Sequence, residues 1–432
     1  MNTTSIDAPT SSRALAAVIH FLPFLVVPQS VNNLVNIVSF FIFLACFSLT
    51  YNKGIAPTIS RLVLFCLVVY VGHPLLTEDH IVPRRTISPI ITFNGAILLF
   101  KAFDICIVSL WDQQPPHWVR NGKRVPLPRA LLGRIGYAFD LFSTVRGSSW
   151  FEGYSWDWAP AYVASYSPPV RSRFAYAARG ILYLGFCYIS LDVFESITRL
   201  ETWELPLARP VLSQPMSTQL LHSFCFCVIM YFGMTISHAL FATLLVALGS
   251  SPKAWVPPFP RNPFTATSLQ DFWSNTWHHY FKRSLKRAVI PIMMLVPQRW
   301  PWSMRRVIRA VIIFGMNTII HLYIVARISS SLNPNAGPAW RFIDKSTLIF
   351  FLLQPIGLLI EREVLIPLST SLLRAHPSVR AWLIRLWAWS WLVWTGRYWL
   401  DVWVRSGMWS PGEGYLGWSP IRGLLFGQWF VM

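Results

Sequence analysis

Long apolar runs, separated by short polar or proline-containing stretches, dominate the pattern of hydrophobic and polar positions along this chain. A helix needs roughly 20 mostly apolar residues to cross a bilayer, and about nine runs approach or exceed that length. The predicted spans are Ala14–Val31, Leu34–Tyr51, Ile55–Leu76, Ile87–Trp111, Phe174–Phe194, Leu220–Leu248, Val307–Ala326, Leu348–Ile366 and Ala381–Val404. The pattern therefore predicts an all-α, polytopic bundle of membrane helices.

The composition supports a membrane protein. Hydrophobic residues occupy 54% of the 432 positions, charged residues occupy 13%, and the mean hydropathy is +0.44. Soluble domains carry about twice that share of charge. We expect a single membrane-embedded domain over residues 1–432, in which residues 1–13 form a short polar N-terminus and residues 112–134 and 249–287 form basic or proline-rich connectors. Because no small-residue cleavage site is evident after residue 13, the first run is expected to remain as a span.

The net charge is strongly positive, at +19. In a soluble protein this balance suggests a nucleic-acid partner. Here the basic residues cluster at span ends and in connectors, which indicates topology determinants and contacts with anionic lipid head groups or a phosphate-bearing cosubstrate. The six cysteines show no zinc-binding spacing, and we predict neither a metal site nor a nucleic-acid partner.

The stretch from Ser268 to Arg287 is polar but studded with aromatic residues. Ser268 and Asp271 are candidate N-terminal caps, and Trp273 and Trp277 recur at helical spacing. This pattern predicts an interfacial helix with its aromatic face toward lipid and its basic end toward phosphates. The basic end consists of Lys282, Arg283, Lys286 and Arg287.

The following span, Val307–Ala326, contains two polar residues, Asn317 and His321. Their four-residue spacing places them on one helical face. An ionisable group at membrane depth is costly unless it faces a polar partner or a cavity, so a functional site is the default inference. A neutral imidazole there can accept a proton from an alcohol that attacks an activated carbonyl. The interpretation requires a ring that faces the interior and a tunnel that joins it to cytosol and membrane.

Other polar groups in the spans have more than one interpretation. Lys101 and Asp104 are three residues apart and are expected to pair. Gln354, which precedes a proline, either lines a pocket or joins helices. The tryptophans of the span Ala381–Val404 suit either an aromatic belt or the wall of a pocket for a rigid apolar ligand. His238 lies deep enough to be a rival to His321, but it lacks a neighbouring polar stripe.

Three separated places in the chain resemble the wax synthase-like branch of the membrane-bound O-acyltransferases, which includes fungal terpenoid and meroterpenoid O-acetyltransferases. A buried histidine, His321, follows the aromatic segment by some forty positions, and Arg146-Gly147 with Trp150 resembles the RG-x-x-W element of that branch. Asn317-Thr318 stands where the branch usually carries Ser-Gly. The residues that fit the aromatic motif are Ser268, Leu269, Phe272, Trp273, Trp277 and His278.

The resemblance implies transfer of an acyl group, most simply acetyl from acetyl-CoA, to a hydroxyl of a lipophilic terpenoid or meroterpenoid. It implies no permanently bound cofactor and a multi-pass location in the endoplasmic reticulum membrane. His321 is then the catalytic base, and His278 positions the thioester or the oxyanion. The expected substrate-binding residues are Asn317, Trp273, Trp277 and Gln354, and the expected acyl-CoA-binding residues are Lys282, Arg283, Lys286 and Arg287.

Other classes of membrane protein make different predictions for this sequence. A long-chain wax ester or sterol acyltransferase is the nearest alternative, and a membrane transporter is the alternative from another class. A transporter predicts paired repeats with broken helices, which the sequence does not show. A prenyltransferase needs clustered aspartates for magnesium diphosphate, but the aspartates here are scattered. A di-iron desaturase needs several histidine boxes, but His278-His279 is the only adjacent pair.

Overall fold

A computed structural model describes residues 29–51, 54–77, 87–170, 172–200, 210–259, 261–330, 343–406, 409 and 416–429. Within this part of the chain, six helical segments are long and apolar enough to cross a membrane. They are Gln29–Ser48, Ile55–Leu76, Ile91–Trp111, Arg173–Thr198, Met216–Ala247 and Trp302–Ala326. The predicted fold class, a bundle of membrane helices, is therefore confirmed.

The nine-span prediction is confirmed only in part. Most of the run Ala14–Val31 lies outside the described residues. The runs Leu348–Ile366 and Ala381–Val404 are helical but do not qualify as spans. In the first, an uninterrupted α-helix covers only Lys345–Ile360 before the backbone changes its winding. In the second, the helix Pro377–Arg405 carries several arginines, which lower its hydropathy.

The N-terminal third packs four helices around an apolar core. These are α2 (Gln29–Ser48), α3 (Ile55–Gly72), α4 (Pro74–Thr77) and α5 (Ile87–Ala102), and α5 continues through the π turn η2 (Phe103–Ile107) and the 3-10 turn η3 (Val108–Trp111). We call the buried cluster between them the N-terminal core; it includes Val38, Ile42, Val68 and Ile105.

The connector after α5 contains a small sheet that the all-α prediction missed. Strand β1 (Trp118–Arg120) pairs antiparallel with β2 (Lys123–Arg124) and with β3 (Tyr154–Trp156), so that Val119 faces Arg124 on one side and Ser155 on the other. Asn121 and Gly122 turn the hairpin with φ angles of 52° and 75°, as the Asn-Gly dipeptide favours. Helices α6 (Leu131–Ser143) and α7 (Ala161–Ala164) complete this region.

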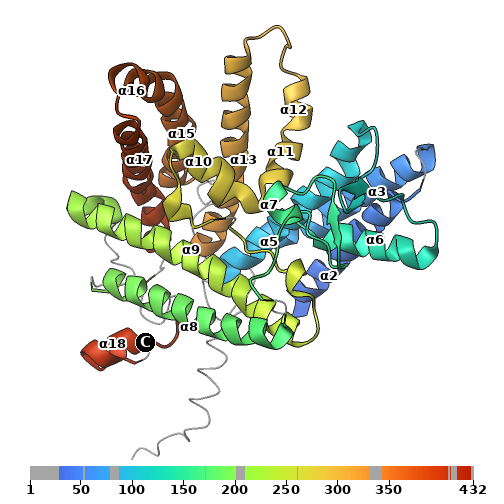
Figure 1. Cartoon of the computed structure of the whole chain (residues 1–432), viewed down its shortest axis with the longest axis horizontal. Helices are drawn as coiled ribbons and strands as arrows, with labels where there is room; N and C mark the ends of the chain where they lie inside the picture. The colour runs from blue at the N-terminus through green and yellow to red at the C-terminus, as the bar shows by residue number, and fades with distance from the viewer. Residues whose placement is uncertain are drawn as a thin grey trace, which may run out of the picture.

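Helices α8 (Arg173–Thr198) and α9 (Met216–Ala247) run side by side along one side of the molecule (Figure 1). Their close approach depends on Gly180, since a Cβ atom there would lie 2.1 Å from Oγ1 of Thr243. Three 3-10 turns lie in the connections that follow these helices: η4 (Val211–Ser213), η5 (Pro252–Ala254) and η6 (Pro263–Thr265).

The C-terminal half begins with a helical segment whose winding changes repeatedly. It passes through α10 (Leu269–Asp271), the π turn η7 (Phe272–Thr276), the 3-10 turn η8 (Trp277–Tyr280), α11 (Lys282–Ala288) and α12 (Ile290–Met294). The chain then forms α13 (Trp302–Ser330), α15 (Lys345–Ile360), the π turn η9 (Glu361–Leu365), α16 (Ile366–Leu372), α17 (Pro377–Arg405) and α18 (Pro420–Phe426).

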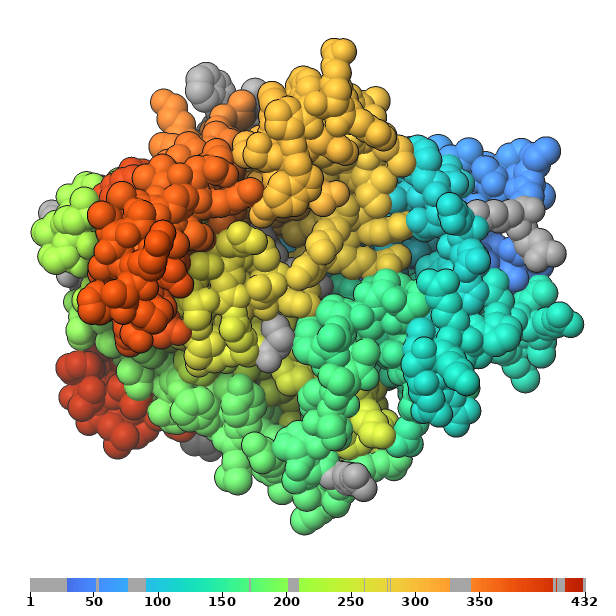
Figure 2. Space-filling model, turned by 45° about the horizontal axis from the view of Figure 1, so that its top comes forward, coloured from blue at the N-terminus to red at the C-terminus, as the bar shows by residue number. Residues whose placement is uncertain are grey.

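A second buried cluster, the C-terminal core, includes Phe272, Trp273, Phe350, Phe351 and Trp399. Figure 2 shows the amber surface of α11–α13 between the orange-red helices α15–α17 and the cyan and blue N-terminal helices. Helices α11 and α13 therefore lie where the two halves of the molecule meet.

Candidate functional site

The imidazole of His321 faces the protein interior from α13. Its ring stacks on Phe351 of α15, with centroids 4.6 Å apart and an interplanar angle of 16°. Trp399 of α17 meets the same ring edge-on, also at 4.6 Å. Two aromatic side chains from two helices therefore fix the orientation of the ring.

His321 and Asn317 line one cavity, as their four-residue spacing predicted. The cavity lies between α5, the α11 region and α13. The amide Nδ2 of Asn317 donates a hydrogen bond of 2.9 Å to the carbonyl of Ile313, which holds this side chain against its own helix. The other lining residues are Phe93, Ala96, Ile97, Phe100, Phe281, Ser284, Leu285 and Ile320.

The cavity measures about 30 Å³, roughly the volume of one water molecule. The expectation of an open tunnel is therefore not met at this cavity, and a ligand larger than water enters it only if lining side chains move. Phe93 and Phe281, whose rings meet edge to face at 5.1 Å, come from opposite walls.

Phe272, Trp273 and Trp277 pack against protein, so the prediction that this aromatic face turns toward lipid is wrong. Phe272 and Trp273 are buried in the C-terminal core, and Trp277 stacks on Phe272 at 5.5 Å. The π turn followed by a 3-10 turn changes the angular spacing, so these side chains do not form one outward stripe. The Ser268 cap is confirmed, because its Oγ accepts a hydrogen bond of 3.0 Å from the N–H of Asp271.

Gln354 joins three elements. It is fully buried, its Oε1 accepts from Nε1 of Trp273 at 3.2 Å, and its Nε2 donates to Oγ1 of Thr395 at 3.1 Å. Of the two interpretations left open for this side chain, the structure supports a junction between helices. Neither Trp273, Trp277 nor Gln354 is among the residues that line the His321 cavity.

A buried carboxylate fixes the beginning of the same segment. Glu361 in η9 is 1% exposed and accepts hydrogen bonds from the backbone N–H groups of Leu269 and Gln270, at 2.5 and 3.0 Å. These N–H groups have no partner within the short helix α10, so Glu361 takes the place of a helix cap. Sequence patterns did not indicate this contact, because the partners are some 90 residues apart.

The two arginines of α11 bind carboxylates. Nε of Arg283 donates to Asp104 at 2.9 Å, and Nε of Arg287 donates to the other oxygen of Asp104. Arg287 also holds Asp112 with two hydrogen bonds, at 2.8 and 2.6 Å. The predicted Lys101–Asp104 pair is therefore wrong, and Lys101 instead donates to the carbonyl of Thr144 at 2.7 Å.

The two lysines of α11 differ from the arginines. Within the described part of the chain, neither Lys282 nor Lys286 has a carboxylate within ion-pairing distance. Partial burial, and then the charge of Lys286, lower the pKa of Lys282. Two neighbouring cations without a counterion favour the binding of an anion.

His279 is buried beside Tyr162, with ring centroids 4.5 Å apart in an edge-to-face contact. Burial, followed by the charge of Lys282, lowers the pKa of His279 to about 4. The imidazole is therefore neutral near pH 7. The side chain of its neighbour His278, the second predicted catalytic residue, lies outside the described residues.

The RG-x-x-W element holds the proline-rich connector in place. The guanidinium of Arg146 donates to the carbonyls of Val256 and Pro257, and the ring of Trp150 meets that of Trp255 edge-on at 5.5 Å. Gly147 adopts a φ of 86°, and a Cβ atom there would lie 2.8 Å from Ala159. This element therefore positions the connector that leads into the segment 268–288.

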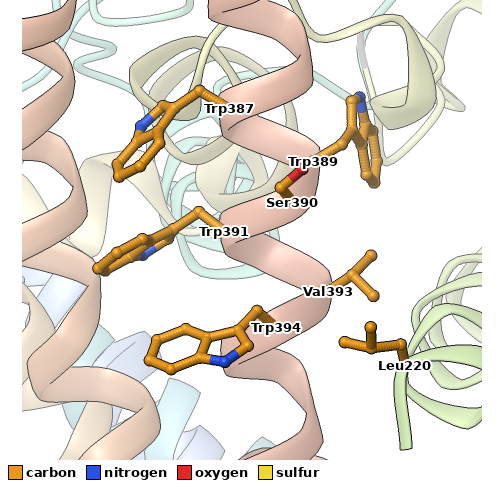
Figure 3. Close-up of a pocket in the computed structure, with 7 residues that line it drawn as sticks. All are labelled: Leu220, Trp387, Trp389, Ser390, Trp391, Val393 and Trp394. Carbon is orange, nitrogen blue, oxygen red and sulfur yellow. The ribbon is translucent and has the colours of Figure 1, made fainter. Parts of the chain in front are cut away.

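An open groove of about 690 Å³ lies between α9 and α17, the helix that contains the tryptophan-rich predicted span Ala381–Val404. Trp387 and Trp391 project from one side of α17, and Trp389 projects from the other (Figure 3). The groove shares no lining residue with the His321 cavity. Its lining residues are Leu220, Trp387, Trp389, Ser390, Trp391, Val393 and Trp394.

The fold and the site define a multi-pass helical membrane protein with a histidine and an asparagine beside an internal cavity. Residues 256–352 match the model of the membrane bound O-acyl transferase family. The matched region contains the segment 268–288 together with Asn317, His321 and Phe351.

Three curated relatives are similar to parts of this chain. "Acetyltransferase eriL" of Hericium erinaceus is 28% identical over 203 residues, which cover 45% of this chain and 48% of the relative. "Acetyltransferase ataH" of Aspergillus terreus is 30% identical over 120 residues, 27% of this chain and 35% of the relative. "O-Mevalon transferase macI" of Penicillium terrestre is 26% identical over 181 residues, 41% of this chain and 40% of the relative.

The chain thus aligns with less than half the length of each of these relatives. No solved structure shows a significant match to it.

Proposed function

We propose that this protein transfers an acyl group, most simply acetyl from acetyl-CoA, to a hydroxyl of a lipophilic terpenoid or meroterpenoid in the endoplasmic reticulum membrane. The observation that carries the proposal is the placement of His321 and Asn317 on one cavity inside the family-matched region. Two of the relatives are named as acetyltransferases, which favours the short acyl donor.

In the proposed reaction, His321 accepts the proton of the acceptor hydroxyl as its oxygen attacks the thioester carbonyl. The carbon–sulfur bond then breaks, and the leaving CoA thiolate takes the proton back from the imidazolium. The stacking of His321 on Phe351 and its edge-on contact with Trp399 keep the ring in one orientation for both proton transfers. Asn317 and His278 are proposed to orient the thioester or to stabilise the oxyanion.

The cavity must widen before this reaction takes place. Phe93 and Phe281 both line the cavity beside His321 and contact each other, and rotation of either ring is the proposed way to admit the acyl group. Lys282 and Lys286 are the proposed contacts for the phosphates of CoA, since the neighbouring arginines already bind Asp104 and Asp112. Trp273, Trp277 and Gln354 are proposed to support the substrate site from the core rather than to touch the substrate.

The test is an acyl-transfer assay on membranes that contain the protein. Radiolabelled acetyl-CoA and palmitoyl-CoA are each offered with terpenoid, sterol and long-chain alcohols. We expect acetyl transfer to a terpenoid alcohol, and we expect His321→Ala to lower kcat by at least about 100-fold. Phe426→Ala, at an exposed position in α18, is the control. Transfer of palmitate instead supports a wax ester or sterol acyltransferase, and consumption of neither donor contradicts the proposal.

A further inference from the structure

Asp104 is the centre of a buried ionic cluster that joins two walls of the His321 cavity. Its side chain is 3% exposed and lies in the π turn η2, within a membrane span. Each carboxylate oxygen binds a different arginine of α11. Because both partners are charged, these hydrogen bonds are stronger and more directional than neutral ones.

The cluster extends on both sides of Asp104. Arg287 links Asp104 to Asp112 just beyond the end of the span. Arg283 lies over the ring of Trp158, with its guanidinium carbon 4.0 Å from the ring centroid. These contacts restrict both arginines to one arrangement, so the distance between the span and α11 is fixed.

The joined elements are those that line the cavity. Phe93, Ala96, Ile97 and Phe100 belong to α5, the helix that continues into the turn carrying Asp104. Ser284 and Leu285 of α11 lie between the two arginines in sequence and line the opposite wall. His321 and Asn317 complete the cavity from α13, which makes no ion pair with this cluster in the described part of the chain.

We propose that Asp104 is a positioning residue, which sets the separation of α5 and α11 and thereby the width of the cavity beside His321. It does not touch the substrate. The expected effect on kcat rests on the proposed function, but the effect of Asp104 on the separation of α5 and α11 does not.

The kinetic test compares Asp104→Asn with a matched control. Glu195→Gln removes one partner of another buried ion pair, with Arg199 at the end of α8, whose side chains are 3% and 6% exposed. We expect Asp104→Asn to lower kcat for acyl transfer by about 10- to 100-fold, because a displacement near 1 Å has that effect. KM for acyl-CoA should change less than about twofold, and Asp104→Glu, which keeps the charge, should recover part of kcat.

A merely structural role gives a different result. In that case Asp104→Asn and Glu195→Gln lower activity only in proportion to the loss of folded protein, and kcat per folded molecule is unchanged. Arg283→Gln is the second variant, because it leaves the Asp104–Arg287 pair intact. We expect an intermediate fall in kcat for this variant, and an unchanged kcat would overturn the proposal.

The geometric test does not depend on enzymatic activity. Ala96→Cys and Ser284→Cys place thiols on opposite walls of the cavity, and the cross-linking of the two thiols as a disulfide under mild oxidation is timed with and without Asp104→Asn. We expect the rate of cross-linking to change at least about threefold in the variant. An unchanged rate refutes the positioning role. Absence of acyl transfer in the unmodified protein, together with a changed rate, refutes only the proposed function.

Discussion

His321 and Phe351 lie face to face, with ring centroids 4.6 Å apart and planes only 16° from parallel. The two residues come from different helices, α13 and α15, and both fall inside the family-matched region. Because a stacked ring restricts rotation of the imidazole about its own bonds, Phe351 determines where the His321 nitrogens point.

Replacement of Phe351 by leucine should therefore impair catalysis more than stability. We expect Phe351→Leu to lower kcat by about tenfold, because the His321 ring gains alternative orientations. The measurement is the acyl-transfer rate per folded molecule in membranes. Phe186→Leu, at an exposed position on α8, is the control and should leave the rate unchanged. Equal rates in the two variants would show that the stacking has no catalytic consequence.

The Trp273–Gln354 hydrogen bond should contribute to stability. Trp273→Phe leaves Oε1 of the fully buried Gln354 without this donor, at a cost of about 1–3 kcal/mol. Thermal unfolding in detergent measures the loss. Gln354→Leu should lower the free energy of unfolding by less in the Trp273→Phe variant than in the parent, because both substitutions remove the same hydrogen bond. If the stability losses of the two substitutions simply add, the explanation is wrong. Trp382→Phe, at an exposed position, is the control and should leave stability unchanged.

Two glycines with similar backbone angles should differ in their tolerance of alanine. Gly147 has a φ of 86° and an added Cβ would lie 2.8 Å from Ala159, whereas Gly122 has a φ of 75° and nothing within 4 Å. We expect Gly122→Ala to cost about 1 kcal/mol from backbone strain alone. Gly147→Ala should cost about 3 kcal/mol, because the clash adds to the strain. A similar shift of the unfolding temperature in both variants would contradict the packing argument.

The lysines of α11 should affect the binding of acyl-CoA rather than the chemical step. We expect Lys282→Gln with Lys286→Gln to raise KM for acyl-CoA by about tenfold, with kcat nearly unchanged. The effect should diminish at high salt, since charged contacts near the surface are screened. Lys253→Gln, at an exposed lysine paired with Glu152, serves as the control. An unchanged KM would exclude these lysines as the phosphate contacts.

His279 should make the protein less stable in mild acid. Its folded pKa of about 4 lies below the usual value of 6.5, so between these values the unfolded chain binds more protons than the folded chain. Stability from this residue is therefore complete above about pH 6.5 and is lost as the pH falls toward 4.

The corresponding measurement is the fall in unfolding temperature between pH 7 and pH 5. We expect this fall to be smaller in His279→Gln than in the parent. His376→Gln, at an exposed histidine ahead of α17, should leave the fall unchanged. The explanation fails if the two variants behave alike.

Local sequence patterns predicted much of the helical framework and one part of the candidate site. Apolar run length located the six spans of the described chain, because lipid demands that length of any crossing helix. The i, i+4 spacing of Asn317 and His321 correctly placed both on one surface, since α13 has regular α-helical winding there.

Features that depend on distant partners were not predictable in the same way. Periodicity over residues 268–287 assumed one continuous α-helix, but the π and 3-10 turns alter which side chains share a face. The pairing of Asp104 with Arg283 and Arg287 links residues about 180 positions apart, whereas sequence proximity favoured Lys101. The spacing of the two arginines was a usable signal for a shared partner, but it did not identify the carboxylate.

Arg146 donates to the carbonyls of Val256 and Pro257, and this contact crosses the boundary of the family-matched segment. That segment begins at residue 256, so its first two residues are held by a side chain 110 positions upstream. Truncation to residues 256–352 would therefore remove a side chain that anchors the first residues of the segment.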